Sequence, residues 1–327
     1  MAVSETLKAL NTIRDFIRWG SSEFYRRKLT FGHGFVSAMD EAKYLTLYSL
    51  ELPFDWPESY FDCALTAEER QRVTEILELR ARLRQPAAYI THESWFCGHK
   101  FYVDERVLVP RSPIAELIAN QFEPWIDSGQ VTRILDLCTG CGCIAIACQY
   151  AFADAEVCAS DISLDALEVA RVNCRNHDLE GRLTLYESDL LDQIPPQLFD
   201  VIVCNPLYVD AEDMAALTDE FRFEPTIGLA AGSDGLDLVE RILCHAVNFL
   251  SDRGVLFLEV GNSQGAMMEK YSFLPMTWLE FEFGGSGVCC IQSKDLKQQN
   301  QKITQIKNQS VVIQRLQISE AKDGMVG

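Results

Sequence analysis

The 327-residue sequence has few of the features that mark membrane, secreted or disulfide-rich proteins. No uninterrupted apolar run is long enough to span a bilayer, and residues 1–5 lack the basic and apolar regions of a signal peptide. We therefore expect a cytoplasmic protein that does not bind membranes. The twelve cysteines are sparse for a disulfide scaffold and fall within predicted strands and helices, so we expect reduced thiols.

Basic residues are also scarce. Lysine and arginine number 29 against 48 acidic residues, which gives a formal net charge of −19, and the body of the chain has no basic run. This disfavours DNA as a substrate, because phosphate binding needs a concentrated basic surface. An acidic surface attracts basic partners, and ribosomal proteins are one such class.

The chain lacks a recognisable metal-ligand pattern. Cys138, Cys141, Cys143 and Cys148 lie close together, but the first three share a turn whose backbone is expected to face a cofactor. No second Cys-x-x-Cys pair and no histidine follow at ligand spacing. We expect no metal, and we interpret these cysteines as small apolar residues packed against a tight turn.

The length suits two domains, and the sequence pattern changes along the chain. Residues 1–92 repeat apolar positions at helical spacing, and Thr66 followed by Glu69 signals a helix start, so we predict a helical substrate-recognition domain. Short alternating segments over 93–111 predict a hairpin linker. The Gln- and Lys-rich residues 295–327 predict a mobile tail.

Residues 112–294 alternate strands and helices. Near-continuous apolar strands between amphipathic helices predict a mostly parallel α/β sheet covered on both faces. Residues 284–287 predict a tight hairpin, so that the last strand returns antiparallel at an edge. The expected strands cover residues 131–137, 155–160, 182–187, 199–204, 254–261, 276–283 and 288–293.

The first chemical motif is a strand that runs into a glycine-rich turn and then a helix over 143–151, a pattern that cradles adenosine-type cofactors. Asp136 ends this strand. Asp161 ends the next strand about twenty residues downstream, where an acid can hold both ribose hydroxyls. Asp189 ends the third and can accept from an adenine amino group. Any one acid can instead cap a helix, but three at successive strand ends predict cofactor binding.

The second motif is Asn205-Pro206-Leu207-Tyr208, at the end of the fourth strand. The Asn205 side-chain oxygen and the Pro206 carbonyl can accept both hydrogens of a planar amide and fix its nitrogen for methyl transfer. Tyr208 would stack on that amide. Alternatively, Asn-Pro turns the chain at a strand end.

On these motifs the chain resembles the glutamine methyltransferases of translation, over roughly residues 5–293. The resemblance implies a class I methyltransferase sheet and S-adenosylmethionine as cofactor. It implies cofactor binding by Asp136, Cys138, Thr139, Gly140, Cys141, Gly142, Asp161, Asp189, Leu190 and Asn205. It implies catalysis by Asn205, Pro206 and Tyr208, and substrate binding by Asn205, Pro206, Leu207, Tyr208 and Phe96.

Residues 109–114 favour the branch of the family that methylates a glutamine of the third large-subunit ribosomal protein. The expected partner is this basic protein, either free or within an assembly intermediate. Release-factor enzymes usually carry Pro-Arg-Pro-x-Thr-Glu there. Leu207 departs from the family, which usually has a second proline at that position. Three alternatives stay open: a release-factor methyltransferase, an adenine-specific DNA methyltransferase and, owing to Leu207, a non-catalytic module that only binds cofactor or ribosomal protein.

Overall fold

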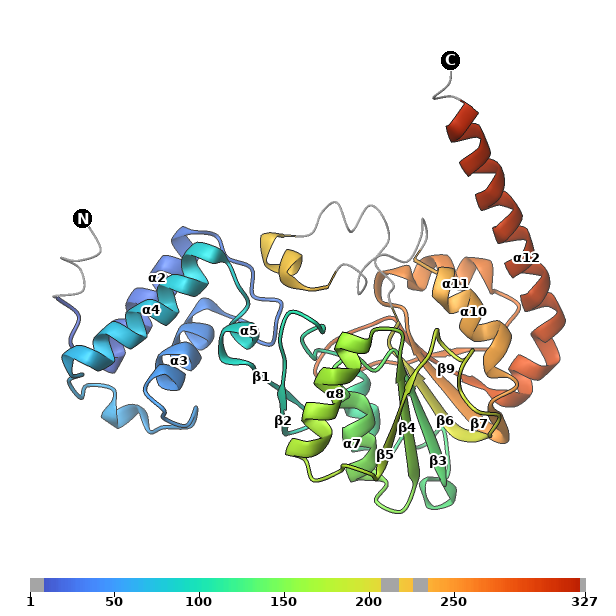
Figure 1. Ribbon diagram of the computed structural model, residues 1–327, viewed down its shortest axis with the longest axis horizontal. Coiled ribbons are helices and arrows are strands. Elements are labelled where there is room, and N and C mark those ends of the chain that lie inside the picture. The colour runs from blue at the N-terminus through green and yellow to red at the C-terminus, as the bar shows by residue number, and fades with distance from the viewer. Residues whose placement is uncertain (1–8, 207–217, 226–234, 324–327) are drawn as a thin grey trace. The chain divides into compact units, whose positions relative to one another are not determined.

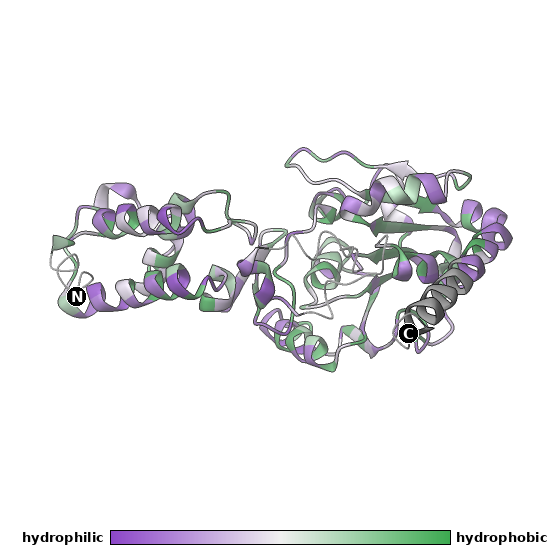
Figure 2. Ribbon diagram, turned by 90° about the horizontal axis from the view of Figure 1, so that it is seen from above, coloured by the Kyte–Doolittle hydropathy of each residue, from purple (hydrophilic) through white to green (hydrophobic). Residues whose placement is uncertain are grey.

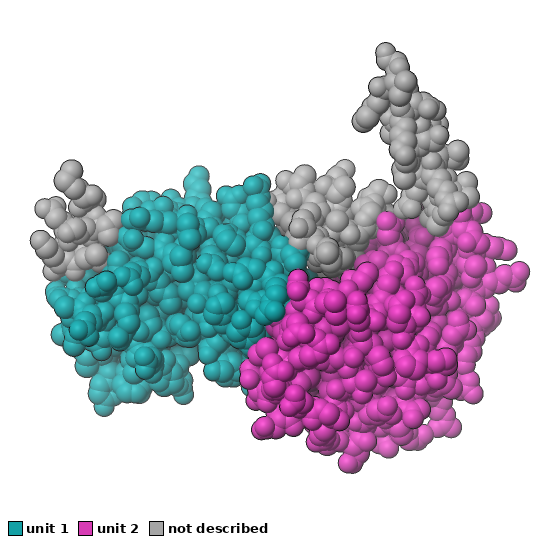
Figure 3. Space-filling model, in the orientation of Figure 1, with its two compact units in different colours: residues 1–111, 217–225 teal, residues 112–216, 226–327 magenta. Residues whose placement is uncertain are grey.

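The chain divides into two units, coloured teal and magenta in Figure 3. Unit 1 comprises Met1–Arg111 and Leu217–Pro225, and unit 2 comprises Ser112–Ala216 and Thr226–Gly327. The computed structural model describes residues 9–206, 218–225 and 235–323, with side chains up to residue 309. The second segment of unit 1 was not expected from the sequence, because it follows the fourth predicted strand of the other unit.

Amphipathic helices build unit 1, and Figure 2 shows hydrophilic and hydrophobic residues alternating along them. Thr66 caps one of these helices, and the reciprocal hydrogen bonds between Thr66 and Glu69 confirm the predicted start signal. The core gathers around Phe16, Phe24 and Leu45, which are fully buried. The elements are α2 (Ile13–Arg26), α3 (Ala38–Ser49), η1 (Glu58–Tyr60), α4 (Ala67–Leu83), α5 (Ala87–Thr91), the hairpin strands β1 (Glu93–Phe96) and β2 (His99–Tyr102), and η3 (Asp219–Phe223).

A seven-stranded sheet forms the centre of unit 2, in the order β5-β4-β3-β6-β7-β9-β8 (Figure 1). The strands β3 to β7 run parallel, which confirms the predicted fold class. The strands are β3 (Arg133–Leu137), β4 (Glu156–Asp161), β5 (Leu183–Glu187), β6 (Phe199–Cys204), β7 (Leu250–Glu259), β8 (Thr277–Trp278) and β9 (Val288–Gln292). The helices are α6 (Ile114–Ala119), η2 (Ser128–Gln130), α7 (Cys143–Ala151), α8 (Leu164–Asn176), α10 (Asp237–Ala246), η5 (Gly261–Ser263), α11 (Gln264–Lys270) and α12 (Ser293–Asp323).

The terminal hairpin is confirmed, but the predicted place of its last strand is wrong. β9 is antiparallel and lies between β7 and β8, so the edge strand is β8. The apolar run of β9, Val288 to Ile291, is buried and suits an interior strand. The strand expected over 276–283 shrinks to two residues. One reason is that the amides of Glu282 and Phe283 donate to the Glu116 carboxylate, at 2.9 and 3.0 Å, instead of to a neighbouring strand.

The segment predicted to be a mobile tail forms a helix through residue 323, and the first turns of this helix join the core of unit 2. α12 contacts α10 and β7, and Leu296 and Ile303 are fully buried there. The aliphatic residues that recur at helical spacing in this polar segment explain why it docks. Across the described parts of the chain, no helix is both long and apolar enough to cross a membrane.

Removing the buried part of Ile303 should destabilise the protein. Ile303→Ala is expected to cost about 2–5 kcal/mol of unfolding free energy, because it leaves a cavity among packed apolar side chains. Urea unfolding would measure the change. Gln301→Ala, at an exposed position of the same helix, is the matched control and should stay within about 0.5 kcal/mol of the unmodified protein. Equal stability of the two variants would show that α12 does not contribute to the core.

Candidate active site

Four neighbouring strands, β5-β4-β3-β6, end at the same edge of the sheet. Leu137 at the end of β3 lies opposite Ser160 of β4 on one side and Cys204 of β6 on the other. Asp161 of β4 lies opposite Glu187 of β5. The residues that follow these strands therefore converge, and the carboxyl ends of parallel strands are where such folds bind ligands.

The glycine-rich loop between β3 and α7 adopts an unusual backbone. Cys138, Gly140 and Gly142 have φ of 59°, 54° and 83°, in the left-handed region. Gly142 is also close-packed, because a Cβ there would stand 3.3 Å from the Cβ of Ala170 in α8. A non-glycine residue such as Cys138 in this region is strained, and such strain is typical of functional loops. α7 begins at Cys143 and ends at Ala151, as predicted.

Asp136 is fully buried beneath this loop. Its Oδ2 accepts from the Thr139 hydroxyl at 2.5 Å and from the Ala145 amide at 3.1 Å, so one carboxylate oxygen ties the loop and the first turn of α7 to β3. Its Oδ1 is buried without a hydrogen-bond partner among the described residues. Burial raises the pKa of this carboxyl to about 7, against the lowering effect of the two hydrogen bonds.

Asp161 lies against the same loop. Its Oδ2 accepts from the Gly140 amide at 2.9 Å, and its Oδ1 accepts from the Ser163 amide at 2.9 Å, just before α8. Burial raises the pKa of this carboxyl, and the backbone hydrogen bonds partly oppose the rise. The structure thus brings two of the predicted cofactor acids together around one loop, although Asp161 also has the helix-start contact that the alternative interpretation required.

Asp189 and Leu190 follow β5 at the same edge. Asp189 forms an ion pair with Arg241 of α10 at 2.9 Å, and Arg241 also contacts Asp192 at 3.3 Å. Sequence reasoning missed Arg241, because no local pattern links it to Asp189, which comes much earlier in the chain. Leu190 has a left-handed φ of 55° and its carbonyl accepts from the Ser188 hydroxyl at 2.7 Å.

The amide motif begins at the end of β6, next to the central strand. Asn205 is half-buried and Pro206 is buried, while Leu207 and Tyr208 lie outside the described residues. Cys204, directly before Asn205, lies opposite Leu137, directly before the glycine-rich loop, in the parallel pair of β6 and β3. The two predicted motifs, about sixty residues apart in sequence, therefore begin side by side at the same edge of the sheet.

Phe96 belongs to unit 1. It lies in β1 and is 5% exposed, whereas its neighbour Trp95 is 60% exposed. The predicted part of Phe96 in a substrate pocket stays a prediction.

Two buried glutamates, which the sequence analysis did not connect, hold residues 218–225 within unit 1: Glu220 lies in η3 and Glu224 directly follows it. Glu220 accepts from the Thr30 amide at 3.0 Å and pairs with Arg84 at 2.8 Å. Glu224 forms a two-point ion pair with Arg111, at 2.5 and 2.8 Å. Buried ion pairs of this kind fix geometry more reliably than they add stability.

The residues at the sheet edge offer acceptors for a nucleotide-type cofactor. The unpartnered Oδ1 of Asp136 and the carboxylate of Asp161 surround a loop in which the glycine backbone can approach a ligand. In the described part of the chain, no group of three or more His, Cys, Asp or Glu residues is arranged to hold a metal. All twelve cysteines are free thiols.

Comparisons with known proteins show which families the chain resembles. Residues 115–222 match the family model of the methyltransferase small domain. The ribosomal protein uL3 glutamine methyltransferase of Francisella tularensis subsp. tularensis is 46% identical over 293 residues, 89% of this chain and 93% of that protein. The enzyme of the same name from Bordetella pertussis is 46% identical over 272 residues, 83% and 91% of the two chains. Among solved structures, the ribosomal protein L11 methylase from Lactobacillus delbrueckii subsp. bulgaricus is 17% identical, with a TM-score of 0.38, over 55% of this chain and 77% of that one.

The two relatives, together with the matched domain, define the chain as a methyltransferase. The 46% identity to the two relatives, over most of the chain, also shows to which methyltransferase family the chain belongs. The chain belongs to the family of ribosomal protein uL3 glutamine methyltransferases.

The raised pKa of Asp136 predicts a specific pH dependence. In the folded state the carboxyl titrates at about 7, above its value of about 3.9 in an unfolded chain. Folding therefore favours the protonated Asp136 carboxyl. The stability that this carboxyl contributes is fully present below about pH 4 and is lost as pH rises to about 7. Asp136→Asn keeps the acceptor oxygen but cannot titrate.

The measurement is urea unfolding of the unmodified protein and of Asp136→Asn at several pH values. The stability of the unmodified protein relative to the variant should fall by about 1 kcal/mol per pH unit between pH 5 and 7. Stability curves that stay parallel across this range would show that Asp136 is already ionised in the folded protein.

Proposed function

We propose that the protein transfers a methyl group from S-adenosylmethionine to the side-chain nitrogen of a glutamine in ribosomal protein uL3. The observation that carries the proposal is the parallel pairing of β3 and β6, since it places Leu137, directly before the glycine-rich loop, opposite Cys204, directly before the Asn205-Pro206 motif. A cofactor on that loop would lie beside an amide held by that motif. The names of the two relatives supply the substrate.

The sheet edge would hold the cofactor, which supplies an electrophilic methyl group on a sulfonium. Asp161 would accept from the ribose hydroxyls, and the glycine-rich loop would face the rest of the ligand. Asp136 would act through the loop that it ties to β3. Asp189 would accept a hydrogen bond from the adenine amino group while it remains paired with Arg241.

The chain's own contribution to the reaction is positioning. An amide nitrogen is a poor nucleophile because its lone pair is delocalised into the carbonyl. Asn205 and the Pro206 carbonyl would accept from the two amide hydrogens and hold the nitrogen in line with the methyl group, and Tyr208 would stack on the amide plane. Orientation of this kind can contribute several kcal/mol to the reduction of the barrier.

The charge of the chain suits the proposed substrate. A net charge of −19 attracts basic ribosomal proteins and speeds their encounter with the enzyme. Unit 1 would select the protein, and unit 2 would carry out the chemistry in the cytoplasm.

The test is incubation of the full chain with labelled S-adenosylmethionine and, in parallel, with unmethylated uL3, unmethylated ribosomal precursor particles, a peptide-chain release factor and duplex DNA. Mass mapping should locate one methyl group on a glutamine of uL3. Label on the release factor alone or on DNA alone would establish one of the two enzyme alternatives. Cofactor binding without any transfer would establish the non-catalytic module that Leu207 leaves open.

Asn205→Ala should separate positioning from cofactor binding. We expect turnover on uL3 to fall about a hundredfold or more with little change in affinity for S-adenosylmethionine, because the main effect of the lost contact is on the orientation of the reacting nitrogen. Initial rates and calorimetry measure the two quantities. Asn248→Ala, at an exposed position, is the control. Near-normal turnover of Asn205→Ala would remove Asn205 from the catalytic site.

Asp161→Ala should weaken binding of S-adenosylmethionine by about 1.5–3 kcal/mol, the range for hydrogen bonds to a charged group. Calorimetry on the folded variant measures the loss. The matched control is Ser163→Ala, which removes the side-chain cap of α8 but leaves the Asp161 carboxylate in place. If both variants bind the cofactor equally well, Asp161 serves only the start of the helix.

A further inference from the structure

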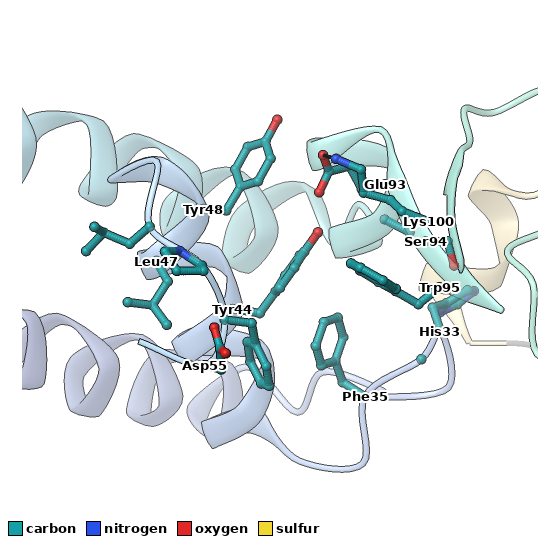
Figure 4. Close-up of a pocket in the computed structure, with 15 residues that line it drawn as sticks. His33, Phe35, Tyr44, Leu47, Tyr48, Asp55, Glu93, Ser94, Trp95 and Lys100 are labelled. Carbon is teal, nitrogen blue, oxygen red and sulfur yellow. Dashed lines mark hydrogen bonds and ion pairs between the residues drawn. The ribbon is translucent and has the colours of Figure 1, made fainter. Parts of the chain in front are cut away.

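Unit 1 contains a pocket of about 690 Å³ that no part of the proposed reaction uses. It is lined by residues of α3, of the segments that flank this helix, of α5 and of the β1-β2 hairpin. Figure 4 shows Phe35, Tyr44 and Trp95 directed toward a common space. The volume is in the range of pockets that enclose a drug-sized ligand, so it can take at least one long side chain of a partner.

Aromatic rings form most of this pocket. Tyr44 lies at its centre, with ring centroids 5.0 Å from Phe35 and 6.2 Å from both Tyr48 and Phe54. The hydroxyls of Tyr44 and Tyr48 donate to the side-chain and backbone oxygens of Thr91, each at 3.1 Å. These bonds hold two rings in place before any ligand arrives.

Part of this aromatic surface is open to solvent. Trp95 is 60% exposed and Phe54 is 48% exposed, although both are large apolar residues. Exposed aromatic groups at the mouth of a pocket are typical of protein-binding surfaces, where they supply most of the binding energy.

The charges at the pocket favour a cation. The carboxylate of Asp55 forms no ion pair within the described residues, whereas the ammonium of Lys100 is paired with Glu93 at 2.8 Å. His33 stays neutral near pH 7, because burial lowers its pKa to about 4. The lining residues, which are all described, therefore include an unpaired carboxylate, that of Asp55, and no unpaired cation. An anion in the pocket would be repelled by Asp55, whereas a cation could pair with it.

Aromatic faces also attract cations. One ring of this pocket already shows the interaction, since the Lys43 ammonium lies 4.8 Å from the Phe54 ring centroid. Arginine fits better than lysine, because its planar guanidinium can stack on a ring and pair with a carboxylate at the same time.

We propose that this pocket binds an arginine side chain of the protein substrate, stacked on the aromatic rings and paired with Asp55. The inference rests on the proposed function, because it assigns the pocket to the same basic substrate. It gives unit 1 a defined contact for selecting that protein, separate from the amide motif of unit 2.

The first experiment uses the full chain with uL3 and S-adenosylmethionine. Trp95→Ala and Asp55→Asn should each raise KM for uL3 about three- to tenfold with kcat unchanged, because a cation–π contact or an ion pair that does not involve the reacting atoms contributes to uniform binding. The controls are Tyr25→Ala and Glu68→Gln, an exposed aromatic residue and an exposed acid of unit 1 that do not line the pocket. Unchanged KM in both pocket variants, in an enzyme that methylates uL3, would overturn the inference and leave the proposed function intact.

The second experiment does not depend on methyl transfer. Acetyl-Gly-Arg-Gly-amide is titrated into the full chain while NMR follows the indole N–H of Trp95, identified by its loss in Trp95→Ala. The signal should shift and saturate, and Asp55→Asn should weaken the binding. The citrulline peptide, which has the same shape without the charge, should leave the signal in place.

Equal binding of the arginine and citrulline peptides would overturn the assignment of a cation site. If uL3 is not methylated but the arginine peptide still binds selectively, the proposed function fails and the guanidinium site stands.

Discussion

The candidate active site depends on one buried carboxylate. Asp136 lies at the end of the central strand β3, and its Oδ2 accepts from both the glycine-rich loop and the start of α7. The loop in turn contacts β4 through Gly140 and Asp161, and it begins beside the end of β6, since Leu137 lies opposite Cys204. An acid in an apolar interior is unfavourable when ionised. The surrounding sheet therefore keeps the Asp136 carboxylate in an interior where its ionised form is less stable than in water. The hydrogen bonds that this carboxylate accepts hold the loop against the ends of the neighbouring strands.

The fold could be predicted where the signals are local. The residues of α7 follow a glycine-rich turn, and the strands of the parallel sheet are apolar runs bounded by polar residues, so neither depends on distant partners. The place of β9 between β7 and β8 could not be predicted, because strand order is decided by contacts between distant segments. The same holds for α12, whose polar composition conceals two residues that become buried only against α10 and β7.

In the candidate site too, features with a local sequence signal could be predicted, and features that depend on contacts between distant residues could not. Acids that follow successive strands could be predicted to converge, because parallel strands end at one edge. The partner of Asp189 could not, since Arg241 comes from a helix far along the chain. The aromatic pocket of unit 1 was also missed, because its rings are scattered between Phe35 and Trp95 and no periodic pattern connects them. Alternation in β1 shows that Trp95 and Phe96 face opposite ways, but not which of them is exposed.

The buried glutamates of Leu217–Pro225 have a consequence for the order of folding during synthesis. Unit 1 is discontinuous, and the carboxylates that pair with Arg84 and Arg111 belong to residues 220 and 224. A ribosome that has released only the first 111 residues has not yet supplied them. The amino-terminal unit therefore completes its interior only after β3, β4, β5 and β6 have been translated. Because this segment follows Asn205 in the chain, the last step in closing unit 1 is covalently tied to the strand that carries the amide motif.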